Sequence, residues 1–259
     1  MTRLDEIIHG DCLAGLKSLP DGCVDLCVTD PPYELQQHSG AGAFGRKNRE
    51  YHHGIDHLQS GVSNDILREI MRVCKRPNIY IFCSKDQLPQ LLLFALDNGL
   101  KYDLLTWHKT NPVPTCNNKY LSDTEYIVFM RNGANLYGTY ETKRKYFITP
   151  TNVEDKRQWG HPTIKPLGIV QTLISNSSQP GGVILDPFMG SGTTAVAALR
   201  EGRHYIGWEI DGEYCRVARE RIETAVIQQR TEREYTNTTS RLSESHDACI
   251  NVRAQGKSI

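Results

Sequence analysis

The sequence predicts an α/β fold in which a mostly parallel sheet carries helices on both of its faces. Two observations predict it. Short apolar segments with many β-branched residues alternate along the chain with segments of helical spacing, which is the pattern of successive β–α–β units. A Gly-rich turn also joins one of the strands directly to a helix, between Val183 and Arg200.

The individual elements are expected in chain order. Strands are predicted over residues 24–29, 78–83, 102–107, 125–130, 183–185 and 204–210. Helices are predicted over residues 65–75, 87–96, 167–174, 193–200 and 213–230. The first helix illustrates the argument, because Ile66, Ile70 and Val73 recur at helical spacing on one of its sides.

One domain, residues 1–230, is expected to contain all of these elements, because a chain of 259 residues suits a single large α/β domain. Two segments interrupt the alternation. Residues 34–60 are polar and rich in Gly and His, and residues 110–160 have weak periodicity. Long segments of this kind in a compact domain are usually functional or mobile. The polar composition of residues 231–259 predicts a disordered tail.

The composition excludes several classes of protein. Lys and Arg together number 30, as do Asp and Glu, so the net charge is zero. A generally basic nucleic-acid coat is therefore excluded, although a local basic face is not. The longest apolar run, from Leu91 to Leu96, is far shorter than the roughly 20 residues of a membrane span. We therefore expect a cytoplasmic protein that does not contact a membrane.

Neither a disulfide framework nor a metal site is expected. The eight cysteines contain no Cys-x-x-Cys pair, and the N-terminus has no apolar stretch typical of a secretion signal. His38, His52, His53 and His57 lie close together in the sequence, but no Cys or carboxylate completes a tetrahedral set at the usual spacing.

A strand followed by a Gly-rich turn, residues 183–194, predicts a site for an adenosine-containing cofactor. Gly190 and Gly192 allow close approach of the backbone to a ligand, and Glu209 ends the next strand, where an acid grips a ribose diol in this topology. Motifs that cradle pyrophosphate or triphosphate are absent from the sequence, and Asp186 together with Glu209 would repel them. S-adenosylmethionine, with a positive centre and free ribose hydroxyls, fits better. A purely structural turn is the alternative interpretation.

A second motif, Asp30-Pro31-Pro32-Tyr33, follows the first strand predicted to lie in the sheet. Two consecutive prolines make a stiff turn, so it would present a carboxylate, a carbonyl and an aromatic ring at a strand end. Asp30 and the Pro31 carbonyl can accept the two N–H groups of an exocyclic amine, and Tyr33 can stack on a base that has left its helix. An ordinary strand-ending turn is the alternative.

With these motifs the sequence strongly resembles the amino-methyltransferases of DNA, in particular the beta class, in which the catalytic motif precedes the cofactor motif. The resemblance covers residues 7–222 and is carried, in the family's order, by residues 8–12, 30–33, 107–109, 161–166, 186–194 and 207–211. It implies a Rossmann-like methyltransferase fold with permuted motif order, S-adenosylmethionine as cofactor and double-stranded DNA as substrate.

The resemblance also implies roles for individual residues. Asp30, Pro31, Pro32 and Tyr33 would hold the target amine. Asp11 and the backbone of Cys12 would contact the cofactor's adenine, and Thr163 and Lys165 would lie near its carboxylate. The remaining cofactor contacts implied are Asp186, Phe188, Gly190, Ser191, Gly192, Thr193 and Glu209.

Several alternatives stay open at the level of the substrate. In this family Asp-Pro-Pro-Tyr usually accompanies N6 of adenine, so cytosine-N4 methylation is the nearest alternative and an RNA amine a further one. Cytosine-C5 chemistry is set aside because the sequence has no Pro-Cys dipeptide. A catalytically inactive nucleic-acid-binding protein of the same fold is the alternative from another class. A homodimer is compatible with the sequence, and a restriction endonuclease partner is not implied by it.

Basic side chains indicate where DNA would bind. Residues 110–160 match the position of the family's target-recognition region, and residues 34–60 are expected to form a mobile loop over the active site and the DNA. The candidate DNA contacts in and beside these segments are Arg46, Lys47, Lys109, Lys143, Arg144 and Lys145.

Overall fold

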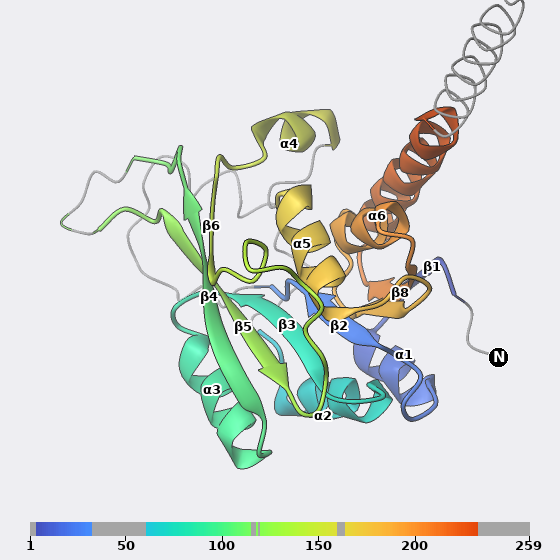
Figure 1. The fold of residues 1–259 in the computed structure, drawn as a ribbon. Helices are drawn as coiled ribbons and strands as arrows, with labels where there is room; N and C mark the ends of the chain where they lie inside the picture. Colours follow the sequence, from blue (N-terminus) through green and yellow to red (C-terminus); the bar gives the residue numbers. More distant parts are fainter. Residues whose placement is uncertain (1–3, 33–60, 115–117, 119, 160–163, 233–259) are drawn as a thin grey trace, which may run out of the picture.

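The computed structural model describes residues 4–32, 61–114, 118, 120–159 and 164–232. The strands within these residues form one sheet, in the order β1-β8-β7-β2-β3-β5-β4-β6 (Figure 1). Their bounds are β1 (Glu6–His9), β2 (Leu26–Thr29), β3 (Asn78–Cys83), β4 (Lys101–Lys109), β5 (Thr124–Arg131), β6 (Tyr146–Thr149), β7 (Val183–Asp186) and β8 (His204–Glu209).

The sheet is mostly parallel, as predicted. Strands β1, β8, β7, β2 and β3 pair with one another in parallel. Strand β5 runs antiparallel to both of its neighbours, β3 and β4, and β6 pairs in parallel with β4. All described strands except β5 therefore end at the same edge of the sheet, which we call the carboxyl edge.

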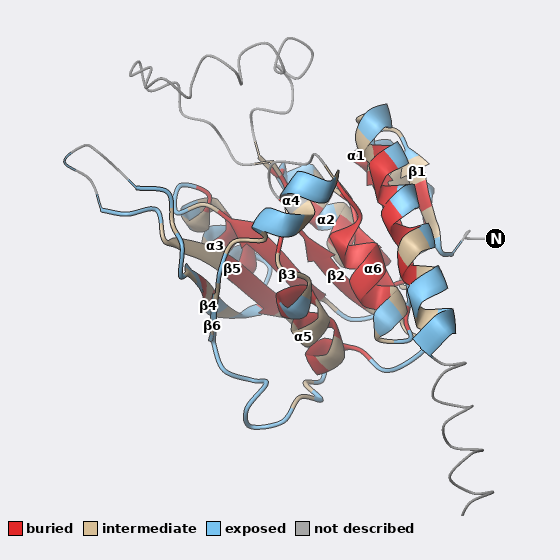
Figure 2. Ribbon diagram, turned by 90° about the horizontal axis from the view of Figure 1, so that it is seen from above, coloured by how far each residue is buried: buried red, intermediate tan, exposed pale blue. Residues whose placement is uncertain are grey.

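Helices cover both faces of this sheet. They are α1 (Cys12–Ser18), α2 (Asn64–Val73), α3 (Leu88–Asp97), α4 (Val153–Trp159), α5 (Leu167–Ser177), α6 (Thr193–Arg200) and a C-terminal helix over residues 212–232. Helices α1, α2 and α3 pack on one face, and α5, α6 and the C-terminal helix pack on the other. Figure 2 shows the buried strands between these two helical layers.

Alternation of side chains along the strands explains the two layers. On β3, Tyr80 and Phe82 join the core under α5 and α6, whereas Ile79, Ile81 and Cys83 join the core under α1, α2 and α3. Every residue of β3 is buried, as expected for a strand covered on both faces.

The direction of the chain connections reverses between β7 and β2. From β7 the chain passes through α6 to β8 on one side, and from β2 it passes through α2 to β3 on the other. In open α/β sheets, ligands bind outside the carboxyl ends of the strands at such a reversal. The fold therefore singles out the turns after β2 and β7.

The structure adds elements that the periodicity did not predict: β1, α1, β6 and α4. Each has seven residues or fewer, too short to carry a clear period. A start signal for α1 is present in the sequence, because the Asp11 carboxylate accepts a hydrogen bond from the Ala14 amide, 2.8 Å away, as an N-cap does.

The structure describes only part of the three segments predicted to interrupt or follow the domain. Strands β5 and β6 lie within residues 110–160, so part of the predicted recognition segment belongs to the sheet itself. The predicted loop 34–60 and nearly all of the predicted tail 231–259 lie outside the described residues. No helix in the described ranges is long and apolar enough to cross a membrane.

Candidate active site

Three carboxylates meet at the carboxyl edge, around the reversal between β7 and β2. Asp30 directly follows β2, Asp186 is the last residue of β7 and Glu209 is the last residue of β8. The Thr29 hydroxyl donates to Oδ1 of Asp186 over 2.6 Å, which joins the ends of β2 and β7. The two motifs singled out in the sequence therefore lie side by side.

Asp186 organises the turn after β7. Its side chain is buried, and Oδ1 also accepts the backbone N–H of Phe188 at 3.0 Å. Burial raises the pKa of Asp186 to about 7, although the hydrogen bonds of Thr194, Thr29 and Phe188 oppose the shift. Asp186 therefore shapes the turn from within rather than presenting a carboxylate to solvent.

The glycines of this turn have the backbone conformations that the sequence predicted. Gly190 and Gly192 have φ values of 51° and 80°, in the left-handed region. A Cβ atom on Gly192 would also lie 3.0 Å from the Cβ of Ala218 on the C-terminal helix. Glycine is needed there both for the turn and for packing.

Glu209 closes the turn from the neighbouring strand. Its Oε2 accepts the Gly190 amide at 2.7 Å, and its Oε1 accepts the Asp211 amide at 2.9 Å. Burial raises the pKa of Glu209, and the two amides oppose that rise. Each carboxylate oxygen retains acceptor capacity, which suits a vicinal diol.

Ser191 and Thr193 have a partner that the sequence did not predict. Nη1 of Arg221, on the C-terminal helix, donates to the Ser191 carbonyl at 2.6 Å and lies 2.8 Å from the Ser191 hydroxyl and 3.2 Å from the Thr193 hydroxyl. Arg221 is buried, and its guanidinium also lies 3.6 Å from Asp155 and 6.0 Å from the Trp159 ring centre, both on α4. Both hydroxyls thus bond within the protein.

The predicted adenine contacts lie next to Glu209. Strand β1 pairs with β8 in the register that places His9 opposite Glu209, and the Gly10 amide donates to the Glu209 carbonyl at 3.0 Å. Asp11 is exposed at the start of α1, and Cys12 is buried. The structure therefore brings Asp11 and Cys12 to the same end of the sheet as the glycine turn.

Asp30 belongs to a chain of alternating charges. Nζ of Lys165 lies 2.8 Å from Oδ2 of Asp30 and 3.0 Å from Oε2 of Glu125, and Nζ of Lys109 lies 2.8 Å from Oε1 of Glu125. Phe82 packs beneath Lys165, whose Nζ is 5.5 Å from the ring centre. We call Asp30, Lys165, Glu125 and Lys109 the charge chain.

The charge chain gives two of the predicted site residues contacts that the sequence did not predict. Lys165, predicted near the cofactor's carboxylate, forms ion pairs with Asp30 and Glu125. Lys109, predicted to contact DNA, is mostly buried against Glu125 and the Trp107 ring. Glu125 was not predicted, because nothing in the local sequence shows that β5 lies beside β3.

The proline turn after Asp30 is held by a buried amide. Gln87 is 3% exposed; its Nε2 donates to the Pro32 carbonyl at 3.3 Å, and its Oε1 accepts the Ser84 amide at 3.0 Å. The predicted site residues Tyr33, Arg46, Lys47 and Thr163 lie outside the described residues.

The basic run 143–145 lies away from the three carboxylates. Lys145 pairs with Asp103 in the first half of β4, and Arg144 pairs with Glu141. Just before the run, Thr142 and Tyr137 bond to Asn176 near the end of α5. The neighbouring Ser177 carbonyl accepts from Asn78, the first residue of β3. The run therefore lies near the edge of the sheet at which β3 and β4 begin, opposite the carboxyl edge; we call it the amino edge.

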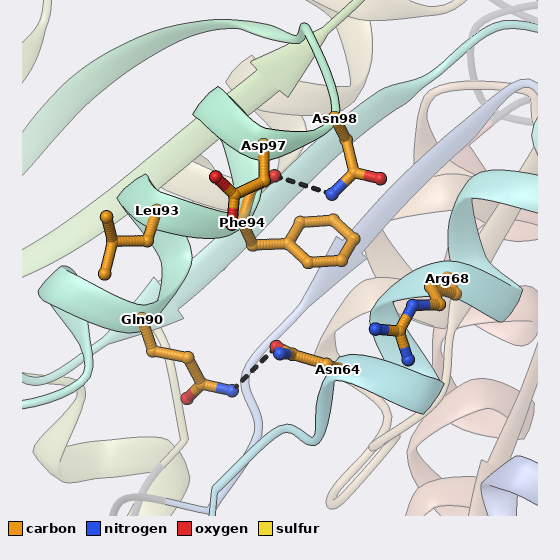
Figure 3. A pocket seen from close by; sticks show the side chains of 7 residues that line it. All are labelled: Asn64, Arg68, Gln90, Leu93, Phe94, Asp97 and Asn98. Atoms are coloured by element: carbon orange, nitrogen blue, oxygen red, sulfur yellow. Dashed lines mark hydrogen bonds between the residues drawn. The ribbon is translucent and has the colours of Figure 1, made fainter.

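A hollow of about 380 Å³ lies elsewhere, between α2 and α3 (Figure 3). It is lined by Asn64, Arg68, Gln90, Leu93, Phe94, Asp97 and Asn98. Several of its polar groups already bond within the protein, for example Gln90 to Asn64 and Asn98 to the Phe94 carbonyl. None of the predicted site residues lines it.

Comparison with known proteins finds relatives among the type II methyltransferases. The chain is 29% identical over 238 residues to the type II methyltransferase M2.DpnII of Streptococcus pneumoniae, covering 84% of this chain and 89% of the relative. It is also 29% identical over 249 residues to the type II methyltransferase M.HinfI of Haemophilus influenzae, covering 85% and 68% of the two chains.

A solved structure and a family model complete the comparison. The complex of M1.HpyAVI with S-adenosylmethionine matches with a TM-score of 0.61 and 25% identity, over 83% of this chain and 98% of that one. The model of the DNA methylase family matches residues 24–220, most of the chain, which include Asp30, the glycine turn and Glu209. The chain therefore belongs to the DNA methylase family.

Proposed function

We propose that the protein transfers a methyl group from S-adenosylmethionine to N6 of an adenine in a specific sequence of double-stranded DNA. The observation that carries this proposal is the hydrogen bond between Thr29 and Asp186, which joins the strand end before Asp30 to the glycine turn. An amine held at Asp30 and a cofactor held at the glycine turn would thus meet in one crevice.

The residues at the glycine turn fit S-adenosylmethionine. Glu209 offers two acceptor oxygens to a ribose diol, and the left-handed Gly190 and Gly192 leave backbone without side chains beside it. Asp11 and Cys12, at the start of α1 just after His9, which pairs with Glu209, are proposed to contact the adenine. When bound, the cofactor supplies an electrophilic methyl group on a sulfonium.

The proline turn is proposed to prepare the amine. Asp30 and the Pro31 carbonyl would accept its two N–H groups, which localises the nitrogen lone pair for attack on the methyl carbon. Tyr33 is proposed to stack on the flipped base. The new C–N bond forms as the S–CH₃ bond breaks, and the nitrogen then loses a proton. Asp30, an acceptor of the amine hydrogens, is also placed to receive it.

The family resemblance implies roles for further residues, and some of these residues form ion pairs within the protein. Thr163 and Phe188 are proposed as further cofactor contacts, while the ion pairs of Lys165 favour a role at Asp30. Arg46 and Lys47 are proposed as DNA contacts. Lys109 and Lys145 are less well supported there, because both form ion pairs within the protein. The same applies to Lys143 and Arg144, which adjoin Lys145.

The setting of the reaction is proposed from the relatives. Two of them are named type II methyltransferases, and we propose restriction–modification as the setting of this chain as well. A companion endonuclease and a homodimer are compatible with this proposal. We propose the cytoplasm as its location, because both substrates are found there.

The test is to incubate the protein with unmethylated DNA and S-adenosylmethionine and to identify methylated nucleosides by mass spectrometry. N6-methyladenine is expected. N4-methylcytosine would keep the mechanism and overturn the base assignment. No product, with cofactor binding established and several DNA and RNA substrates tried, would overturn the proposed activity.

The Asp30→Ala variant tests the role of the proline turn. It should lose methyl transfer by roughly 10²- to 10⁴-fold, because an acceptor for the amine is removed. Its affinity for S-adenosylmethionine, measured by calorimetry, should persist. Asp65→Ala, which removes an exposed carboxylate on α2, is the control. Equal loss of transfer and cofactor binding in Asp30→Ala would show that Asp30 is structural.

A further inference from the structure

We propose that Glu125 is a positioning residue for methyl transfer: through Lys165 it sets the carboxylate of Asp30 for the target amine. Residues of three separate segments meet to form this contact: the end of β2, the turn before α5, and β5. The inference rests on the proposed function, in which Asp30 accepts the amine.

The geometry shows a shared ammonium. Lys165 is 7% exposed, and its Nζ lies 2.8 Å from Asp30 and 3.0 Å from Glu125, so it binds both carboxylates at once. The side chain of Glu125 is 16% exposed, and its second oxygen binds Lys109 at 2.8 Å. The ammonium of Lys165 thus contacts two carboxylates and also lies over the Phe82 ring.

Sharing matters because buried charges interact strongly. At less than about 4 Å and away from bulk water, a pair of unit charges interacts several times more strongly than the same pair in water. A Lys165 that bound Asp30 alone would neutralise it more completely and hold it more firmly. Glu125 takes part of that interaction, so Asp30 keeps acceptor strength for a neutral amine.

The same charge is useful as the reaction proceeds. Positive charge passes from the sulfonium to the amine nitrogen beside Asp30, and a surplus of positive charge around Asp30 would destabilise it there. Asp30, Lys165, Glu125 and Lys109 together are neutral, whereas without Glu125 the remaining three would carry one net positive charge. Glu125 would therefore lower the barrier to transfer without touching either substrate.

Glu125→Gln is the decisive variant, because glutamine keeps the shape and removes the charge. We expect kcat to fall about tenfold or more, as a misplaced or weakened acceptor would cause, with KM for S-adenosylmethionine unchanged within about twofold. Glu125→Asp, which restores the carboxylate, should recover much of kcat. Glu141→Gln makes the same chemical change in the exposed pair with Arg144 and should behave as wild type.

The outcomes separate this inference from the proposed function. An unchanged kcat in Glu125→Gln, with Asp30→Ala inactive, would overturn the inference alone. Methylation by Asp30→Ala at the wild-type rate would overturn the proposed function of Asp30. A joint fall of kcat, cofactor affinity and unfolding free energy in Glu125→Gln, without recovery in Glu125→Asp, would show a structural role and overturn the inference.

Discussion

Asp186 is buried and Glu125 is mostly buried, but the surroundings of these two carboxylates move their pKa values in opposite directions. Burial raises the pKa of Asp186 to about 7, because its hydrogen bonds do not compensate for lost hydration. Burial also acts to raise the pKa of Glu125, but Lys165 and Lys109 outweigh it and the pKa falls to about 2. Asp186 thus titrates near neutrality, while Glu125 stays ionised.

Asp186 should make stability depend on pH. Its pKa is higher in the folded chain than in the unfolded one, so the folded state binds the proton more tightly. As pH rises from about 4 to 7 the unfolded chain loses this proton first, and the free energy of unfolding should decrease. The Asp186→Asn variant, whose Oδ1 can still accept from Thr29 and Phe188, lacks this dependence.

Urea unfolding of both proteins at pH 5 and pH 8 measures the effect. Between these pH values the wild-type chain should lose about 2 kcal/mol relative to Asp186→Asn. Groups other than Asp186 titrate in both proteins, so their contributions cancel in the difference between the two unfolding free energies. A difference between the two proteins that stays constant with pH would mean that Asp186 is ionised throughout in the folded protein.

Sequence reasoning at the residue scale predicted where a side chain lies when that position depends on a local pattern. The common location of Asp30, Asp186 and Glu209 was predictable because each ends or follows a strand, and parallel strands end at one edge. Glu125, Gln87 and Arg221 were not, because each acts on a segment distant in the sequence. Their partners follow only from the strand order and from helix packing.

At the scale of elements, helix α6 has a glycine in the left-handed conformation near each of its ends. Gly192 begins α6 with φ 80°, and Gly202, just after the helix, has φ 71°. Both positions favour glycine for the same backbone reason. Only Gly192 faces a neighbour, Ala218, whose Cβ would lie 3.0 Å from an added methyl group, while nothing lies within 4 Å at Gly202.

The two glycines therefore form a matched pair of variants. Gly202→Ala should lose about 1 kcal/mol of unfolding free energy, the cost of a left-handed alanine. Gly192→Ala should lose about 2 kcal/mol or more, because it also pushes α6 from the C-terminal helix. Only Gly192→Ala should bind S-adenosylmethionine more weakly, by about tenfold, in calorimetry. Equal affinities in the two variants would contradict a cofactor role for the glycine turn.

Length decided which elements could be predicted. The helix 65–75 and the strand 78–83 were found within two residues as α2 and β3, because each shows a complete period or an unbroken apolar run. Strand β6 consists of strand-favouring residues, but it has only four of them, and it forms by pairing with β4. A short strand of that kind has no distinct signal in a single sequence.

At the scale of the whole molecule, one edge of the sheet carries the site, and the charges are unevenly placed around it. The net charge is zero, so DNA affinity must come from local basic groups rather than from the protein as a whole. The run 143–145 is reached from the amino edge, while Asp30 lies at the carboxyl edge. Arg46 and Lys47 belong instead to the segment that continues directly from Pro32.

Salt dependence of DNA binding should distinguish these two basic groups. Each lost phosphate contact reduces the slope of log K against log salt concentration by about 0.9. Arg46→Ala combined with Lys47→Ala should therefore reduce the slope by about 2, measured by fluorescence anisotropy between 50 and 200 mM salt. Lys143→Ala combined with Arg144→Ala should leave it unchanged, since DNA that delivers a base to Asp30 approaches the other edge. A reduced slope in the second pair alone would show that DNA extends along β6 towards the amino edge.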